Sequence, residues 1–201
     1  MSLREEPDQE SWDAWHPAEL TRRLAGLSQP WCVVGGWALD LWLGNQTREH
    51  EDLEFTILRA DFCRFRQALH GMALYTADSG VVAHLPDHEE PADSIWQVWC
   101  RDEVEHSWRV DMMFEPGSPE IWAYKRDPQL IRPRAEMVAT TEDGIPYLKP
   151  VGVLLFKAKH RRPKDEADFK SALPKLPTSE RVWLRNSLAA THPGHDWIGM
   201  L

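Results

Sequence analysis

The sequence lacks any long hydrophobic run. No stretch of its 201 residues approaches the ~18 apolar residues that a transmembrane helix needs. The N-terminal segment MSLREEPDQESWDAW is acidic and has no apolar centre, so it does not look like a signal peptide. We therefore expect a soluble, cytoplasmic protein with no membrane partner.

Cysteines are few, and their spacing excludes two kinds of site. Cys32, Cys63 and Cys100 lie far apart and form no C-x-x-C pair. This spacing argues against a zinc site and against a disulfide framework. Three reduced thiols are typical of a cytosolic protein.

Basic residues are also scarce. The chain has 23 Lys and Arg against 32 Asp and Glu, which gives a formal net charge of −9. Proteins that grip a nucleic-acid backbone usually present a basic face. Here the basic residues are local, at Arg132 and Arg134 and from Lys157 to Lys164. They suit one triphosphate, and we expect no nucleic-acid partner.

The first informative pattern joins a strand to a helix through two glycines. The apolar segment Trp31–Val34 is followed by Gly35-Gly36 and by an apolar helical stretch that Gly44 ends. Glycines at a helix start let a phosphate chain approach backbone N–H groups, which favour anions. A tight strand-to-helix turn would also explain them, so the pattern is ambiguous by itself.

Acidic residues form the second pattern. Apolar and polar side chains alternate in the predicted strand Asp52–Leu58, so Asp52 and Glu54 point to one face. Adjacent carboxylates repel unless a cation neutralises them, and Mg²⁺ does so in phosphoryl and nucleotidyl transfer. Asp111, set among apolar residues, is the expected third carboxylate from a neighbouring strand, because an isolated buried acid is costly. A D-x-E pair is also common on solvated sheet faces, so the context decides.

The remaining periodicity predicts two parts. Residues 1–116 form an N-terminal α/β domain with a mixed sheet, and residues 117–201 form a mainly helical part packed on it, unless both are one compact unit. Pro-rich connections fill the start of the second part. The other expected helices are Pro17–Leu27, Ala60–His70, Val151–Lys159, Lys164–Leu173 and Thr178–Ala190, and the other expected strands are Val81–Leu85, Ile95–Cys100 and Trp108–Phe114.

These motifs together resemble a known superfamily. Residues 33–44 (VVGGWALDLWLG) followed by 47–54 (TREHEDLE) look like the nucleotidyltransferase signature, in the form found in bacterial aminoglycoside and lincosamide nucleotidyltransferases and their uncharacterised relatives. Later segments also fit that group, namely 108–113 (WRVDMM), 144–148 (GIPYL) and 154–169 (LLFKAKHRRPKDEADF). The resemblance runs from about Pro30 to Phe169.

The resemblance implies a fold and a metal site. The fold would be α+β (α/β), with a nucleotidyltransferase-like mixed sheet, flanking helices and a C-terminal helical part. Asp52 and Glu54 would hold Mg²⁺ or Mn²⁺ on an NTP co-substrate. Asp111 would be either a third metal ligand or the base that takes the acceptor's proton.

The resemblance also implies phosphate-binding residues. Gly35 and Gly36 would receive the phosphates, and Arg48 would brace the carboxylates or touch phosphate. Lys157 would reach the triphosphate as a point charge, unless it is a solvated helix lysine. The segment KDEAD, residues 164–168, is expected to form ion pairs rather than to carry chemistry.

The implied reaction moves an NMP group from Mg-NTP to a hydroxyl of a small acceptor, an antibiotic being one option, and releases pyrophosphate. Relatives usually have Asp where Glu54 stands, and its longer arm suits Mg²⁺ less well than Mn²⁺. Glu54 therefore supports the alternative of a non-catalytic nucleotide- or ligand-binding module with the same fold. A D-x-E nuclease fits less well, because the charge balance offers no channel for a phosphodiester strand. The sequence leaves open the acceptor, the NTP and whether the protein is a monomer or a homodimer.

Overall fold

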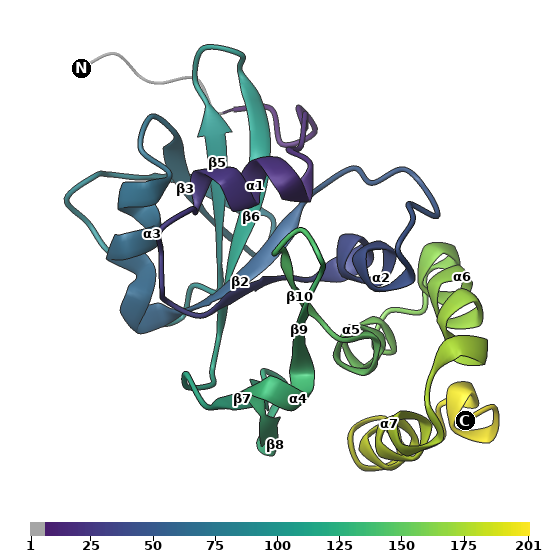
Figure 1. Cartoon of the computed structure of the whole chain (residues 1–201). Coiled ribbons are helices and arrows are strands. Elements are labelled where there is room, and N and C mark those ends of the chain that lie inside the picture. The colour runs from purple at the N-terminus through teal and green to yellow at the C-terminus, as the bar shows by residue number, and fades with distance from the viewer. Residues whose placement is uncertain (1–6) are drawn as a thin grey trace. The chain divides into compact units, whose positions relative to one another are not determined.

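The computed structural model describes residues 7–201 (Figure 1). The chain divides into two compact units. The first unit contains the chain up to Trp31 and residues His50–Glu115. The second unit contains Cys32–Glu49 and Pro116–Leu201. Each unit is thus built from two separate stretches of sequence.

The first unit is a mixed sheet with helices. Its sheet has the strand order β4-β3-β5-β6-β2, in which β2 and β6 are parallel and the other neighbours are antiparallel. The elements are α1 (Pro17–Arg23), β2 (Glu54–Leu58), α3 (Phe62–Ala68), β3 (Ala73–Asp78), β4 (Val81–Leu85), β5 (Gln97–Asp102) and β6 (Ser107–Glu115).

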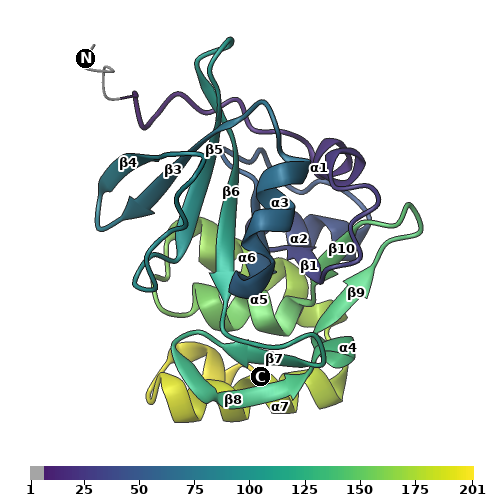
Figure 2. The same ribbon diagram turned by 90° about the vertical axis from the view of Figure 1, so that its left-hand side faces the viewer.

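The alternation in β2 separates a core face from a polar face. Leu53, Phe55 and Ile57 are fully buried, whereas Asp52 and Glu54, which alternate with them and point to the other face, are half-buried. Figures 1 and 2 show α1 and α3 on the same side of this sheet. The core therefore lies between those helices and the apolar face.

The register of the strands aligns five side chains on the other face. Glu54 of β2 is opposite Asp111 of β6, which is opposite Trp99 of β5. Trp99 is opposite Tyr75 of β3, which is opposite His84 of β4. Cross-strand partners share a face of the sheet, so these residues form one row, the Glu54–His84 row.

The second unit packs helices around α5 (Pro150–Lys157), which is buried along almost its whole length and contacts α2, α6 and α7. Strand β10 pairs in parallel with β1 and antiparallel with β9, while β7 and β8 form a separate hairpin. The remaining elements are β1 (Trp31–Val33), α2 (Gly35–Leu43), β7 (Ile121–Tyr124), β8 (Asp127–Pro133), α4 (Arg134–Met137), β9 (Val138–Thr140), β10 (Pro146–Leu148), α6 (Pro163–Ala172) and α7 (Thr178–Thr191).

The predicted α+β class with a mixed sheet is confirmed, with some corrections to the elements. The helix from Pro17 ends at Arg23 rather than Leu27. The prediction missed β3 and the four strands between residues 121 and 148, where Pro-rich connections were expected. Strand β8 contains Pro128 and Pro133 and, among residues 7–201, pairs with β7 alone. Such an edge strand tolerates proline.

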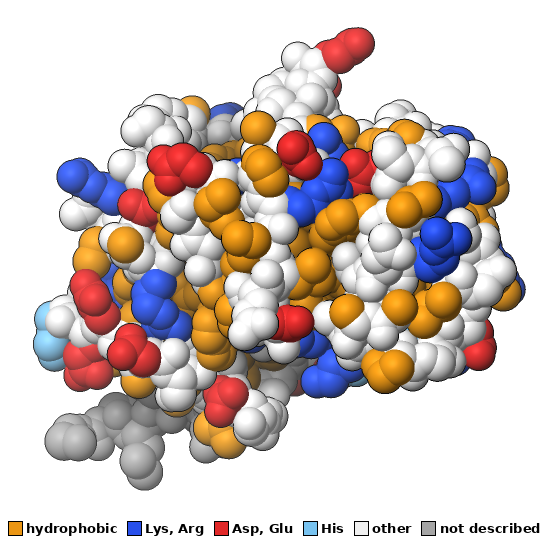
Figure 3. Space-filling view, turned by 90° about the horizontal axis from the view of Figure 1, so that it is seen from below, with side chains coloured by type: hydrophobic (Ala, Val, Ile, Leu, Met, Phe, Trp, Pro, Cys, Tyr) orange, Lys and Arg blue, Asp and Glu red, His pale blue; other side chains and the backbone are white. Residues whose placement is uncertain are grey.

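On the face drawn in Figure 3, Lys and Arg side chains are interspersed with Asp and Glu, without a continuous basic strip. Within residues 7–201, no helix combines the length and the apolar character needed to cross a membrane.

Candidate active site

The first unit holds all three predicted acids. Glu54 begins β2 directly opposite Asp111, and Asp52 lies two residues earlier, just before the strand. The backbone N–H of Asp111 donates to the carbonyl of Leu53 at 2.8 Å, which fixes the alignment of the two segments. The structure thus brings Glu54 and Asp111 together, as the sequence predicted for neighbouring strands.

Asp111 has an unusual environment for a carboxylate. Its side chain is buried, with 4% exposure, and its Oδ2 accepts a hydrogen bond from Nε2 of Gln97 at 2.7 Å. Its Oδ1 is buried and has no hydrogen-bond partner within residues 7–201. Burial raises the pKa of Asp111 well above its usual range, and the carboxyl groups of Glu54 and Asp52 raise it further, whereas the polar groups of the Gln97 and Trp99 side chains lower it.

The environment of Asp111 bears on whether Asp52, Glu54 and Asp111 could bind a divalent cation. In the part of the chain that the structure describes, no three His, Cys, Asp or Glu side chains are grouped closely enough to hold a metal ion as they stand. The donor chemistry does fit, because Asp111 has a buried carboxylate oxygen without a hydrogen-bond partner in the described chain and lies close to the carboxyl groups of Glu54 and Asp52, and oxygen atoms of this kind are the ligands that divalent cations prefer. The metal site at Asp52, Glu54 and Asp111 therefore stays a prediction that the electrostatics support.

The second unit holds the two glycines. Helix α2 begins at Gly35, whose φ of 64° lies in the left-handed region that glycine tolerates best. The residue before it, Val34, makes no side-chain cap for the first turn. Uncapped N–H groups at a helix start favour an anion, which agrees with the predicted phosphate-binding role of Gly35 and Gly36.

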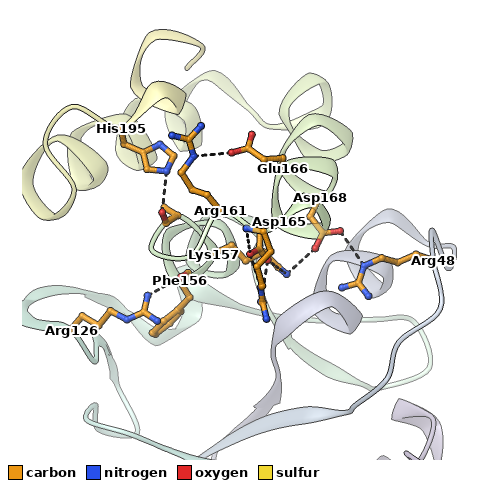
Figure 4. Close-up of polar contacts among 11 residues, drawn as sticks. Arg48, Arg126, Phe156, Lys157, Arg161, Asp165, Glu166, Asp168 and His195 are labelled. Atoms are coloured by element: carbon orange, nitrogen blue, oxygen red, sulfur yellow. Dashed lines mark hydrogen bonds and ion pairs between the residues drawn. The ribbon is translucent and has the colours of Figure 1, made fainter. Parts of the chain in front are cut away.

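The two predicted cations of the second unit are joined through one carboxylate (Figure 4). Lys157, at the end of α5, is buried, and its Nζ lies 3.1 Å from Oδ1 of Asp165 and 2.8 Å from Oδ2 of Asp168. Asp168 also accepts from Nε of Arg48 at 3.4 Å, and Asp165 from Nε of Arg162 at 2.9 Å. These five residues form the Lys157 network.

The Lys157 network settles one alternative and confirms one expectation. Lys157 is not a solvated helix lysine, since its side chain is only 8% exposed. Burial alone would raise the pKa of Asp165, but hydrogen bonds from Arg162 and Lys157 and the charge of Lys157 lower it to about 2. The expected ion pairs of the KDEAD segment are present, and the role of Lys157 towards a triphosphate stays a prediction.

The sequence analysis assigned no role to two polar residues that the structure brings to notice. Asp40, within the apolar helix α2, is buried and accepts a hydrogen bond from Oγ1 of Thr47 at 2.5 Å. An acid inside an apolar helix was a visible signal for this residue. Gln97 carried no such signal, because only the pairing of β5 with β6 brings it beside Asp111.

Comparisons with known proteins bear on the fold and on the resemblance to a family. Residues 18–90 match the family model described as aminoglycoside-2''-adenylyltransferase, a stretch that includes Gly35, Gly36, Asp52 and Glu54. The crystal structure of ANT(2'')-Ia in complex with adenylyl-2''-tobramycin is 13% identical, with a TM-score of 0.56 over 86% of this chain and 94% of that chain. The solution structure of the antibiotic-resistance factor ANT(2'')-Ia is 14% identical, with a TM-score of 0.54 over 86% and 89%. No curated protein sequence matched.

At these identities the likeness in structure shows the fold alone. The family match adds sequence features over residues 18–90. By fold and by sequence, the chain resembles the nucleotidyltransferase superfamily, as predicted, and the family match supports a nucleotidyltransferase.

Proposed function

We propose that the protein is a divalent-metal-dependent nucleotidyltransferase that moves an NMP group from an NTP to a hydroxyl of a small acceptor. The observation that carries the proposal is the buried Asp111 beside Glu54, with one carboxylate oxygen that has no partner in the described chain. Such an arrangement is costly without a nearby cation. In a chain with the nucleotidyltransferase fold, that cation accompanies the triphosphate.

The reaction balances with pyrophosphate as the leaving group. The acceptor oxygen forms a bond to the α-phosphorus, the bond from that phosphorus to the α,β-bridging oxygen breaks, and the hydroxyl proton passes to a base. Asp52 and Glu54 would hold Mg²⁺ or Mn²⁺, which supplies neutralisation of the phosphate charge. Oδ1 of Asp111 would either complete the metal's ligands or take the proton.

We propose that the start of α2 and a basic side chain hold the phosphates. Gly35 and Gly36 offer backbone N–H groups at the start of α2. Of the two cations, Arg48 is the more accessible, with 26% side-chain exposure against 8% for Lys157. We infer that Arg48 contacts phosphate, while Lys157 supports it through their shared partner Asp168.

For the acceptor we propose an aminoglycoside antibiotic. The family match and the complex of ANT(2'')-Ia with adenylyl-2''-tobramycin support this class. A net charge of −9 favours the approach of polycationic sugars. Tyr75 and His84, at the far end of the Glu54–His84 row, line a groove of about 1200 Å³ in the first unit. Its charged lining residues are Asp8, Asp87, Glu103, Arg66 and Arg101.

The test is release of pyrophosphate from ATP or GTP, with Mg²⁺ or Mn²⁺, in the presence and absence of tobramycin. We expect metal-dependent release that requires an acceptor and is lost in Asp52→Asn and Asp111→Asn. Asp93→Asn, at an exposed loop acid of the same unit, is the matched control and should keep the activity.

Calorimetric titration of the same nucleotides separates the two functions considered. Metal-dependent nucleotide binding without pyrophosphate release for any acceptor would favour the non-catalytic binding module. The absence of nucleotide binding with either metal would refute both.

A further inference from the structure

Gln97 holds the carboxyl group of Asp111 from the neighbouring strand. It begins β5 opposite Met113, two residues from the pair Trp99 and Asp111, so it shares their face of the sheet. Its Nε2 donates to Oδ2 of Asp111 at 2.7 Å, at the short end of the usual range for an N–H···O hydrogen bond. The inference drawn from this contact rests on the proposed function.

The contact makes the two oxygens of Asp111 inequivalent. A free carboxylate exchanges its oxygens by rotation about the bond to its side chain. Here Oδ2 is bonded to Gln97, while Oδ1 is buried and without a partner in the described chain. The amide donor therefore selects which oxygen remains available for a ligand.

We propose that Gln97 is a positioning residue, which anchors Oδ2 of Asp111 so that Oδ1 is presented to the metal ion. Residues that orient a metal ligand through such a hydrogen bond are a regular part of metal sites, and their loss typically lowers metal affinity by roughly 10- to 100-fold. Gln97 touches neither metal nor substrate in this role. It acts only through Asp111.

The first experiment asks whether the hydrogen bond exists in solution. In ¹⁵N-labelled protein, the side-chain amide signals of Gln97 are identified by their absence from Gln97→Met, whose side chain has a similar length and no donor. We expect these signals to move towards the values of a free amide in Asp111→Ala. Unchanged signals would overturn the proposal before any metal is added.

The second experiment measures the affinity for Mn²⁺ alone by calorimetry. We expect Gln97→Met to bind Mn²⁺ roughly 10- to 100-fold more weakly than the wild type. Gln97→Asn, which keeps the amide on a shorter arm, should be weakened as well. Gln129→Met makes the same substitution on strand β8 of the second unit, at an exposed position, and should bind like the wild type.

A double variant distinguishes positioning from a structural effect. If Gln97 acts through Asp111, adding Gln97→Met to Asp111→Asn lowers the affinity by less than about 2-fold, because the group to be positioned is already gone. Equal losses with and without Asp111 would overturn the proposal. If Gln97→Met binds Mn²⁺ as tightly as the wild type while Asp111→Asn binds it more weakly, the proposal is also overturned. That result leaves the proposed function intact. No Mn²⁺ binding by the wild type would overturn the metal site and this inference together.

Discussion

Replacing Lys157 by methionine shows whether this residue mainly stabilises the fold or mainly binds the nucleotide. Its Nζ lies within 3.1 Å of Asp165 and 2.8 Å of Asp168, and its side chain is 8% exposed. Breaking a buried ion pair by removing one partner costs about 3–5 kcal/mol, because the other charge stays buried. At about 2–4 °C per kcal/mol for a chain of this size, Lys157→Met should lower Tm by roughly 6–20 °C.

The assay is thermal and urea unfolding without nucleotide, followed by circular dichroism. Lys159→Met is the matched control, since Lys159 is exposed two residues further on and its loss should cost no more than about 0.5 kcal/mol. Equal stability of the two variants would refute the reasoning. A Lys157→Met protein of normal stability that loses nucleotide binding would instead show that the lysine serves mainly as a phosphate ligand.

Three further substitutions test the electrostatics and the backbone. Asp165 has a folded pKa of about 2 against an ordinary 3.8. The ionised carboxylate of Asp165 therefore stabilises the folded state fully above pH 4, and this stabilisation is lost as the pH falls towards 2. In urea unfolding, Asp165→Asn should lower the free energy of unfolding by about 2 kcal/mol at pH 7 and by about half of that at pH 3. The pKa of Asp111 is raised instead, so this residue destabilises the fold as the pH rises above about 4. In metal-free buffer at pH 7, Asp111→Asn should thus unfold at a higher urea concentration than the wild type, and a lower midpoint would contradict this. A Cβ at Gly117 would lie 2.2 Å from the carbonyl oxygen of Ile121, so Gly117→Ala should cost about 1–3 kcal/mol, whereas Gly199→Ala, with open space around it, should leave Tm unchanged.

Local patterns were enough to predict most elements of the fold. Period-2 alternation located β2, and helical spacing with a proline at the first turn located α5. The same patterns failed for β8, because the prolines of an edge strand look like those of a loop. They also failed for β3, because buried residues lie on both faces of this strand. Leu74 is on one face and Tyr75 and Ala77 are on the other, so buried and exposed positions do not alternate.

The candidate site was predictable only as far as single residues carry chemistry. Asp52, Glu54 and Asp111 stand out in the sequence because charged groups among apolar ones need a reason. Gln97 does not, since its importance arises from strand register. The partners of Lys157 were visible as the KDEAD segment, but its burial depends on tertiary packing around α5, which no local pattern reveals.

The interleaving of the two units limits how the protein can be divided. Helix α2, with its Gly35 start, belongs to the second unit, yet it is encoded between two stretches of the first. A cut after Glu115 would give one fragment that carries α2 without α5 and α6, the helices it contacts, and another that carries these two without α2. Neither fragment could complete the second unit by itself. A gene split at this point would give a working protein only by reassembly of both halves. The turn at Gly35, the proposed phosphate-binding turn, therefore cannot be exchanged between proteins together with the C-terminal helices as one contiguous segment.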